Sequence, residues 1–191
     1  YTLSLHDALP TSYAISIHLL FPISSKYNCW RELAGAFFCV EGDTQAVEVF
    51  VPLLRGLGLQ VQTISPESKA QYHLSCALAS NFVCALVQRS AELLSGCGFS
   101  ETDALHALAP LMRSNLAHVI EHGAVSALTG PIERGDTQTV QKHLSCLTER
   151  DDRQLYALLG LEQVKMAQEK HPEQDYGTLA ALLNREKEQN E

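Results

Sequence analysis

The sequence predicts a chain of two parts, an incomplete α/β unit followed by an all-α helical domain, with the boundary near Lys69. Two observations lead to this prediction. Before Lys69, short apolar runs rich in β-branched and aromatic residues flank one helical pattern, which is typical of an α/β unit. After it, segment 69–95 contains neither glycine nor proline, and helical patterns continue toward the C-terminus. The hydrophobic content of 46% suits a globular protein.

The α/β part is predicted to contain two strands, a helix and a third strand. Segment 14–23 alternates and is rich in β-branched residues, and segment 35–43 is a compact apolar run bounded by glycines, so both are expected to be strands. Asp43 or Thr44 is expected to cap a helix that Gly56 and Gly58 end. Segment 59–65 is the third strand, which Pro66 stops. The short links predict a parallel or mixed sheet.

The helical part is predicted to begin with one long, mostly buried helix over residues 69–98, ended by Gly96 or Gly98. Ser100 is expected to cap the next helix, in which Pro110 should cause a kink or an interruption. Three further helices are expected within segments 136–150, 153–170 and 176–188. A polar loop, ALTGPIERGD over residues 127–136, precedes them.

The first twelve residues are set apart from the fold, because YTLSLHDALP resembles the translation of a sequencing adapter. We therefore expect residues 1–12 to be an artefact, assign no role to His6 or Asp7, and expect the natural protein to extend before Tyr13. The predicted domains are residues 13–68, the end of the α/β domain, and residues 69–191, the helical domain.

Charge, hydropathy and cysteine spacing exclude several classes of function. A formal net charge of −8 without a basic stripe argues against a nucleic-acid partner. No apolar run reaches the ~20 residues that a membrane helix needs, so no membrane partner is expected. Six cysteines without a C-x-x-C pair predict reduced thiols and a cytoplasmic protein. His118 and His122 are helical neighbours without a third ligand, so no metal site is predicted.

Polar side chains on the long helix are the first candidates for a functional site. Helical spacing brings Lys69, His73 and Ser80 to one face, with Asn81 further round. Such groups could hold the carboxylate of a small-molecule substrate or polarise its carbonyl group. The alternative is structural: Lys69 is solvated at the helix start, and the other side chains bond to neighbouring helices.

The polar loop is the second candidate. Two glycines and a proline fix its backbone path, and the planar guanidinium of Arg134 suits a carboxylate or phosphate. Asp136 or Thr137 is expected to cap the following helix, which carries His143. The alternative is that Arg134 and Asp136 contact each other and only shape the turn. For this pair we favour the structural role.

Segments KAQYHLSCALASNF and ALTGPIERGDTQTVQKHL resemble the signature segments of Rossmann-like oxidoreductase homologues with a C-terminal helical domain of unknown function. Upstream, SIHLLFPIS and LAGAFFCVEGD resemble the last Rossmann strands of that family. The resemblance covers residues 13–170 and implies an N-terminally truncated Rossmann-like domain followed by a helical domain like that of 6-phosphogluconate dehydrogenase. Two departures stand out. Leu19 replaces the proline that follows the family's histidine, and the glycine-rich first half of the Rossmann domain is absent.

The resemblance also implies a function and assigns residues to it. In the wider group the substrate lies between the two domains, the cofactor is NADP or NAD, and the helical domain commonly forms a homodimer. Catalysis is expected from Lys69, His73 and Asn81, with Lys69 or His73 as proton donor or carbonyl polariser. The residues expected to bind the substrate are His18, Ser80, Thr129, Arg134 and His143.

We therefore predict that the chain is a fragment of an NAD(P)-dependent oxidoreductase and that it is inactive without its missing first half. No residue of this chain is assigned to the cofactor. The alternative is a non-catalytic module that dimerises or senses a metabolite. Turnover of NADPH by the full-length protein would distinguish the two.

Overall fold

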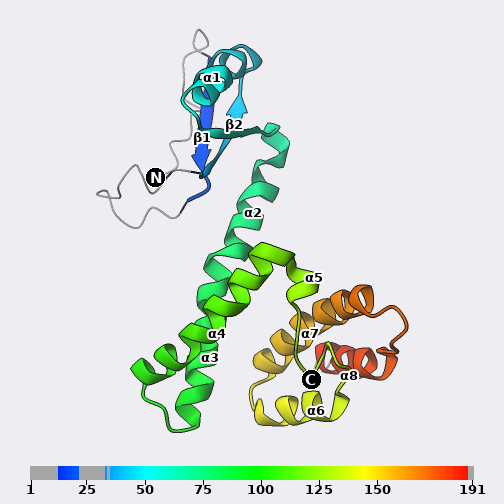
Figure 1. The fold of residues 1–191 in the computed structure, drawn as a ribbon. Helices are drawn as coiled ribbons and strands as arrows, with labels where there is room; N and C mark the ends of the chain where they lie inside the picture. The colour runs from blue at the N-terminus through cyan, green and yellow to red at the C-terminus, as the bar shows by residue number, and fades with distance from the viewer. Residues whose placement is uncertain (1–12, 22–32, 34, 189–191) are drawn as a thin grey trace. The chain divides into compact units, whose positions relative to one another are not determined.

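The computed structural model describes residues 13–21, 33 and 35–188 (Figure 1). The predicted artefact, residues 1–12, lies outside the described residues. The chain divides into two compact units, Tyr1–Ser90 and Ala91–Glu191. A helix begins at Lys69, and its first turns contact the sheet through Lys69 and His73.

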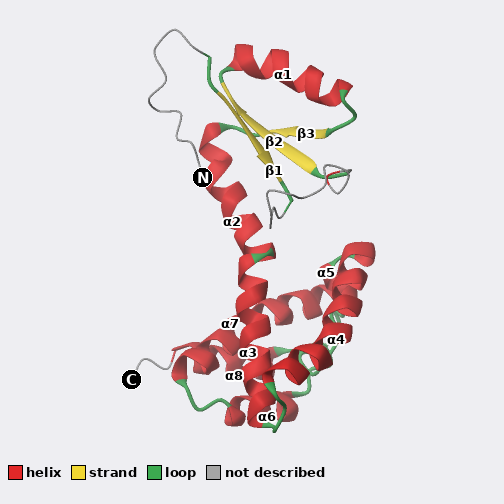
Figure 2. Ribbon diagram, turned by 90° about the vertical axis from the view of Figure 1, so that its left-hand side faces the viewer, coloured by secondary structure: helices red, strands yellow, loops and turns green. Residues whose placement is uncertain are grey.

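The first unit contains a three-stranded mixed sheet, as predicted (Figure 2). Strand β1 (Ile15–Leu19) pairs antiparallel with β2 (Phe37–Gly42), and β2 pairs in parallel with β3 (Gln60–Thr63). Helix α1 (Thr44–Gly56) connects β2 to β3. Asp43 precedes α1 as expected, but its carboxylate accepts a hydrogen bond from the backbone N–H of Ala14 (2.6 Å) and makes no bond to the helix end.

Alternation along the strands gives the sheet one apolar and one polar face. The apolar face packs against α1 and forms the core of this unit, with the buried residues Val40, Val51 and Val61. Because successive side chains of a strand point to opposite faces, Cys39 and Glu41 lie on the other face. The antiparallel register places His18 opposite Cys39. The second face of the sheet therefore presents titratable groups.

The long helix predicted over residues 69–98 is interrupted and mostly exposed, so the prediction of one buried helix is wrong. A 3-10 turn (Pro66–Ser68) leads into α2 (Lys69–Ala79), and α3 (Asn81–Gly96) follows after Ser80. The hydroxyl of Ser80 bonds both the carbonyl of Cys76 (2.6 Å) and Oδ1 of Asn81 (2.9 Å), and such local bonds compete with helical ones. Helix α2 has no buried residue, and α3 has only Ala91.

Pro66–Gly96 is, among the described residues, the one helical stretch long and apolar enough to cross a membrane, judged by length and composition. Such a stretch was not expected from the sequence, because polar residues such as His73 and Asn81 divide it into shorter apolar runs. None of its most apolar 18 residues is buried. A helix that is apolar over so much of its surface needs a covering surface, which is either lipid or protein.

The second unit is helical. Helix α4 (Glu101–His122) begins at Ser100, whose hydroxyl oxygen accepts a hydrogen bond from the N–H of Asp103 (3.2 Å), as predicted. The helix runs through Pro110 without the interruption that was expected as one possibility. A short helix that was not predicted, α5 (Ala124–Ala127), comes next. The three helices predicted from residue 136 onward are confirmed as α6 (Thr137–Cys146), α7 (Arg150–Lys170) and α8 (Gly177–Glu188).

The core of the second unit is formed mainly by α6, α7 and α8 (Figure 1). Its largest fully buried side chains are Leu144, Tyr176, Leu179, Leu183 and Val140. Arg153 of α7 lies at the edge of this core. Its Nε donates to Glu186 of α8 (2.8 Å), and one of its terminal nitrogens donates to the carbonyl of Leu144 (2.9 Å). This packing connects α7 to both α6 and α8.

Candidate functional site

Five side chains of the first unit lie together on the polar face of the sheet. We call them the β1–α2 cluster: His18, Glu41, Lys69, Tyr72 and His73. Lys69 is the first residue of α2, and its ammonium forms an ion pair with the Glu41 carboxylate at the end of β2. The Glu41 side chain is 9% exposed and that of Lys69 is 34% exposed. The pair therefore places a positive charge at the edge of a partly buried site.

His18 of β1 is the centre of the cluster. Its ring lies 5.0 Å from the ring of His73 at 90° and 6.1 Å from the ring of Tyr72. Its Nε2 atom is buried and has no hydrogen-bond partner. Burial, followed by the nearby Lys69 and His73, lowers the pKa of His18 below its ordinary value of 6.5. The imidazole is thus neutral at pH 7, and one of its nitrogens lacks a partner.

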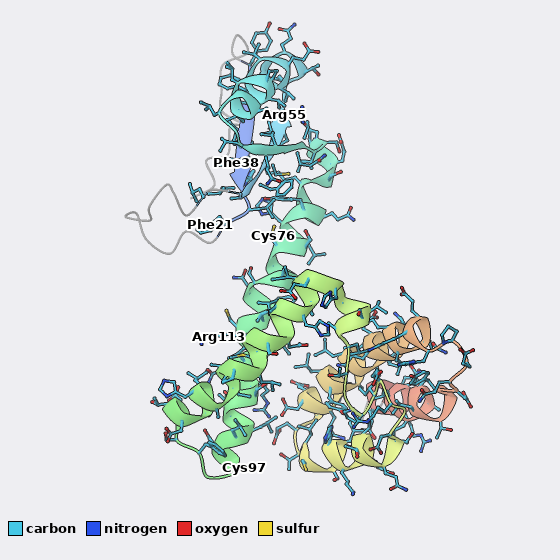
Figure 3. The ribbon with its side chains drawn as sticks, viewed as in Figure 1. Phe21, Phe38, Arg55, Cys76, Cys97 and Arg113 are labelled. Atoms are coloured by element: carbon cyan, nitrogen blue, oxygen red, sulfur yellow. The ribbon has the colours of Figure 1, made fainter. Side chains whose placement is uncertain are left out.

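Two further groups on this side of the sheet, the phenol of Tyr72 and the thiol of Cys39, stay protonated at neutral pH. Burial and the neighbouring Cys76, which is labelled in Figure 3, raise the pKa of Tyr72 to about 12. Burial, with a contribution from Cys76, raises the pKa of the Cys39 thiol above its ordinary value. A thiol or phenol in this state is a hydrogen-bond donor and a poor nucleophile. The arrangement therefore suits polar binding and proton exchange better than covalent catalysis.

The structure brings together three of the residues predicted for the site, His18, Lys69 and His73. Ser80 and Asn81 lie at the break between α2 and α3, where they bond to each other. The sequence reading missed Glu41 and Tyr72. Glu41 could have been found, because a lone carboxylate in an apolar strand needs a partner. Tyr72 carried no comparable signal.

The remaining predicted residues lie in the second unit. Arg134 is exposed in the loop before α6, and Thr129 lies at the start of that loop. His143 of α6 bonds through Nδ1 to the hydroxyl of Tyr156 on α7 (2.9 Å). Asp136 caps α6, as predicted, by accepting from the N–H of Thr139 (3.0 Å).

Glu133 fixes the polar loop from within the second unit. Its carboxylate bonds to Nε2 of His171 (2.7 Å) and lies 3.5 Å from the ammonium of Lys170. Its carbonyl accepts from the hydroxyl of the buried Tyr176 (2.5 Å). The hydrogen bond from His171, with a contribution from Lys170, holds the pKa of the Glu133 carboxyl below its usual value. Contacts inside the second unit thus hold the loop at Glu133, and this carboxylate has a structural role.

A metal ion and a dinucleotide each require a particular arrangement of residues. Across 13–21, 33 and 35–188, no three His, Cys, Asp or Glu side chains are placed to hold a metal. A dinucleotide needs a glycine-rich turn at a helix N-terminus. At the start of α1, Gly42 serves the contact with β1, since a Cβ there would lie 2.3 Å from the Ala14 carbonyl oxygen. The Asp43 carboxylate beside it would repel phosphate, so this turn does not fit a dinucleotide.

Comparisons with known proteins give a family and a fold for this chain. Residues 36–163 match the model of a family described as a domain of unknown function (DUF2520). No curated protein matches the chain. Among solved structures, protein TM1727 from Thermotoga maritima is similar, with 25% identity and a TM-score of 0.65. The "putative NADP oxidoreductase BF3122" from Bacteroides fragilis is also similar, with 22% identity and a TM-score of 0.57.

These matches cover more of this chain than of the two solved structures. They cover 82% and 69% of this chain, but only 62% and 50% of the respective solved chains. The chain thus spans less than two thirds of either structure. The similarity confirms the predicted fold class, an α/β remnant at the end of a Rossmann domain followed by an all-α helical domain. At 22% identity, the second similarity shows the fold alone.

Proposed function

The chain belongs to the DUF2520 family, and from this premise we propose that it is part of an NAD(P)-dependent oxidoreductase. The observation that carries the proposal is the buried, unpartnered Nε2 of His18 beside the Lys69–Glu41 ion pair. Buried polar atoms are nearly always bonded, so an unpaired one in a partly open cluster points to a bound molecule. The name of the Bacteroides fragilis protein adds support for the reaction class.

In this proposal the β1–α2 cluster binds and polarises a carbonyl or imine group of a small substrate. Neutral His18 donates a hydrogen bond to the substrate oxygen or nitrogen through its free ring nitrogen. The ammonium of Lys69 stabilises negative charge that develops there, because a fixed charge in a partly buried site is weakly screened. His73 is exposed and touches His18, so it can exchange the required proton with solvent.

NADP or NAD is implied by the family resemblance and, for the Bacteroides fragilis protein, by its name. The turn at the start of α1 does not fit the dinucleotide, so we assign the nucleotide to a part of the full-length protein outside this chain. No step of the reaction is assigned to it here. Asn81, Ser80, Thr129, Arg134 and His143 keep their predicted roles as hypotheses.

The proposal is tested with the natural full-length protein. Rates of NADPH oxidation are measured with a panel of imines and keto acids, for the unmodified protein and for Lys69→Ala and His73→Ala. Loss of general acid catalysis should lower kcat/KM by about 100-fold or more. Because substitutions can also act through the fold, Lys165→Ala and His106→Ala, two exposed positions outside the cluster, serve as matched controls.

Unchanged rates in both cluster variants would remove Lys69 and His73 from the site. Absence of turnover with every substrate, together with normal NADPH binding, would favour the non-catalytic alternative instead.

We also propose that the helical part pairs with a second copy of this chain, as the resemblance suggests. The exposed apolar side chains favour this role. On α4, Leu116 and Ile120 are 59% and 76% exposed and lie one turn apart, and on α3, Phe82 is 53% exposed. Sedimentation without detergent should give a dimer, and Leu116→Lys combined with Ile120→Lys should give a monomer. Aggregation that only detergent prevents would instead favour lipid as the covering surface.

A further inference from the structure

A groove of about 650 Å³ lies within the second unit, and none of its lining residues belongs to the β1–α2 cluster. One wall is α4, the other is α7, and α5 with the start of the polar loop forms its end. We call it the α4–α7 groove. Its volume is in the range of pockets that hold small organic molecules, about 300–1,000 Å³.

The lining of the groove combines apolar side chains, uncharged polar side chains and one histidine, His118. The chain contains two methionines, and both Met112 and Met166 line the groove. Methionine is flexible and polarisable, and it is common at surfaces that adapt to a ligand. No Asp, Glu, Lys or Arg is among the described lining residues. His118 is the one lining residue among those described that can become charged, so a charged ligand would lose hydration there with little compensation.

Three polar side chains of the groove are available to form hydrogen bonds with a ligand. Ser114 and Asn115 of α4 and Gln163 of α7 line it. Within the part of the chain that the structure describes, none of these three side chains is hydrogen bonded to another protein group. Amide and hydroxyl groups facing a groove from two walls can bind a ligand carbonyl, amide or hydroxyl group and fix its orientation.

We propose that the α4–α7 groove binds an uncharged small organic molecule with an apolar body and one carbonyl, amide or hydroxyl group. The apolar body contacts the methionines, and the polar group bonds to Asn115 or Gln163. The site is separate from the β1–α2 cluster and does not depend on the proposed oxidoreductase activity. Variants of Lys69 and His73 should therefore leave binding in the groove unchanged.

The two methionines offer a direct measurement. With methyl-¹³C-methionine, Met112 and Met166 each give one NMR signal, and Met112→Leu and Met166→Leu assign them. The probes are 2-naphthamide, which is neutral, and 2-naphthoate, its charged counterpart of the same shape. We expect 2-naphthamide to shift both signals saturably and to bind at least 10-fold more tightly than 2-naphthoate.

A blocking variant and a matched control locate the binding. Ala124 lies on the wall formed by α5 and is exposed, so Ala124→Trp should fill the groove and abolish the shifts without disturbing the core. Ala117→Trp adds the same side chain on α4 at an exposed position that does not line the groove, and it should leave them unchanged.

Three results would overturn the proposal. The first is equal or tighter binding of 2-naphthoate, and the second is unchanged shifts in Ala124→Trp. The third is a dependence of both methionine signals on protein concentration alone, which would make the groove a contact between copies of the chain.

Discussion

The ammonium of Lys69, at the first position of α2, forms an ion pair with the carboxylate of Glu41, near the end of β2. These residues are far apart in the sequence, and their contact is one of those that place α2 against the polar face of the sheet. Since Glu41 is 9% exposed, its charge depends on Lys69 for compensation.

Replacing only Lys69 should therefore destabilise the first unit. Lys69→Met leaves the Glu41 carboxylate buried and unpaired, and we expect the free energy of unfolding to fall by about 2 kcal/mol. Lys69→Met combined with Glu41→Leu removes both charges and should recover most of that loss. Urea unfolding followed by circular dichroism measures both effects. Equal stability of the single variant and the parent protein would show that the pair is only a surface contact.

The lowered pKa of His18 predicts a dependence of stability on pH. Because the folded state resists protonation of His18, the unfolded state binds more protons just below pH 6.5. The contribution is present above pH 6.5 and is lost as the pH falls through the lowered folded-state pKa. His18→Gln should flatten the loss of stability between pH 7 and pH 5, measured as urea midpoints. His106→Gln changes an exposed histidine, and its stability should depend on pH as steeply as that of the parent protein.

Glu133 is predicted to stabilise the second unit through the polar loop. Glu133→Ala removes the bond to His171 and should lower the free energy of unfolding by about 1–2 kcal/mol. The control is Glu162→Ala, which removes an exposed carboxylate paired with Lys165 and should change the free energy of unfolding by about 0.5 kcal/mol or less. Since the folded-state pKa of Glu133 is lowered, its contribution is present above pH 4.5 and is lost as the pH falls through the folded-state value. Thermal unfolding at several pH values measures this, and equal effects of the two variants would argue against the proposed role.

Arg153 connects three helices of the second unit, so its loss should be more costly. Arg153→Ala leaves the Glu186 carboxylate, 9% exposed, without its partner and frees the carbonyl of Leu144. We expect a loss of about 2–4 kcal/mol, because an unpaired buried charge is unfavourable. The exposed Lys165→Ala is again the control. A loss no larger than that of the control would show that Glu186 is adequately solvated without the arginine.

The break between α2 and α3 should close in Ser80→Ala. Without the hydroxyl, the bonds to Cys76 and Asn81 are lost, and alanine favours the helix by about 0.5 kcal/mol. The backbone N–H of Cys84, which bonds to the carbonyl of Ser80, should then exchange with solvent more slowly than in the parent protein. Ser90 bonds in the same way to the carbonyl of Leu86 inside a continuous helix, so Ser90→Ala is expected to change exchange little. Faster exchange in Ser80→Ala would mean that other contacts impose the break.

The order and type of the elements could be predicted from local sequence signals. The glycines around α1 and the helix caps at Ser100 and Asp136 set the ends of helices through residues that are close in the sequence. A local sequence pattern is therefore enough to predict them. The break at Ser80 was missed because it depends on two neighbouring side chains bonding locally in place of the helix. The expected burial of residues 69–98 was wrong because an apolar composition predicts a covering surface but does not say which molecule provides it.

The candidate site was predictable only in part, for a physical reason. Lys69 and His73 share a helical face, so spacing alone brings them together. Glu41 and His18 join them through strand register, which sets which residues of β1 and β2 share the polar face. Register depends on pairing between distant segments, and no local pattern reports it. The contact between Glu133 and His171 was missed for the same reason.

The most direct test of the proposed function uses the Lys69→Met and Glu41→Leu double variant of the full-length natural protein. Its stability should be close to that of the parent, so a change in rate reports the chemistry and not the fold. The proposal predicts that kcat/KM for NADPH-dependent reduction falls by about 100-fold or more. A stable double variant with the parent's kcat/KM would contradict a role of the β1–α2 cluster in the reaction.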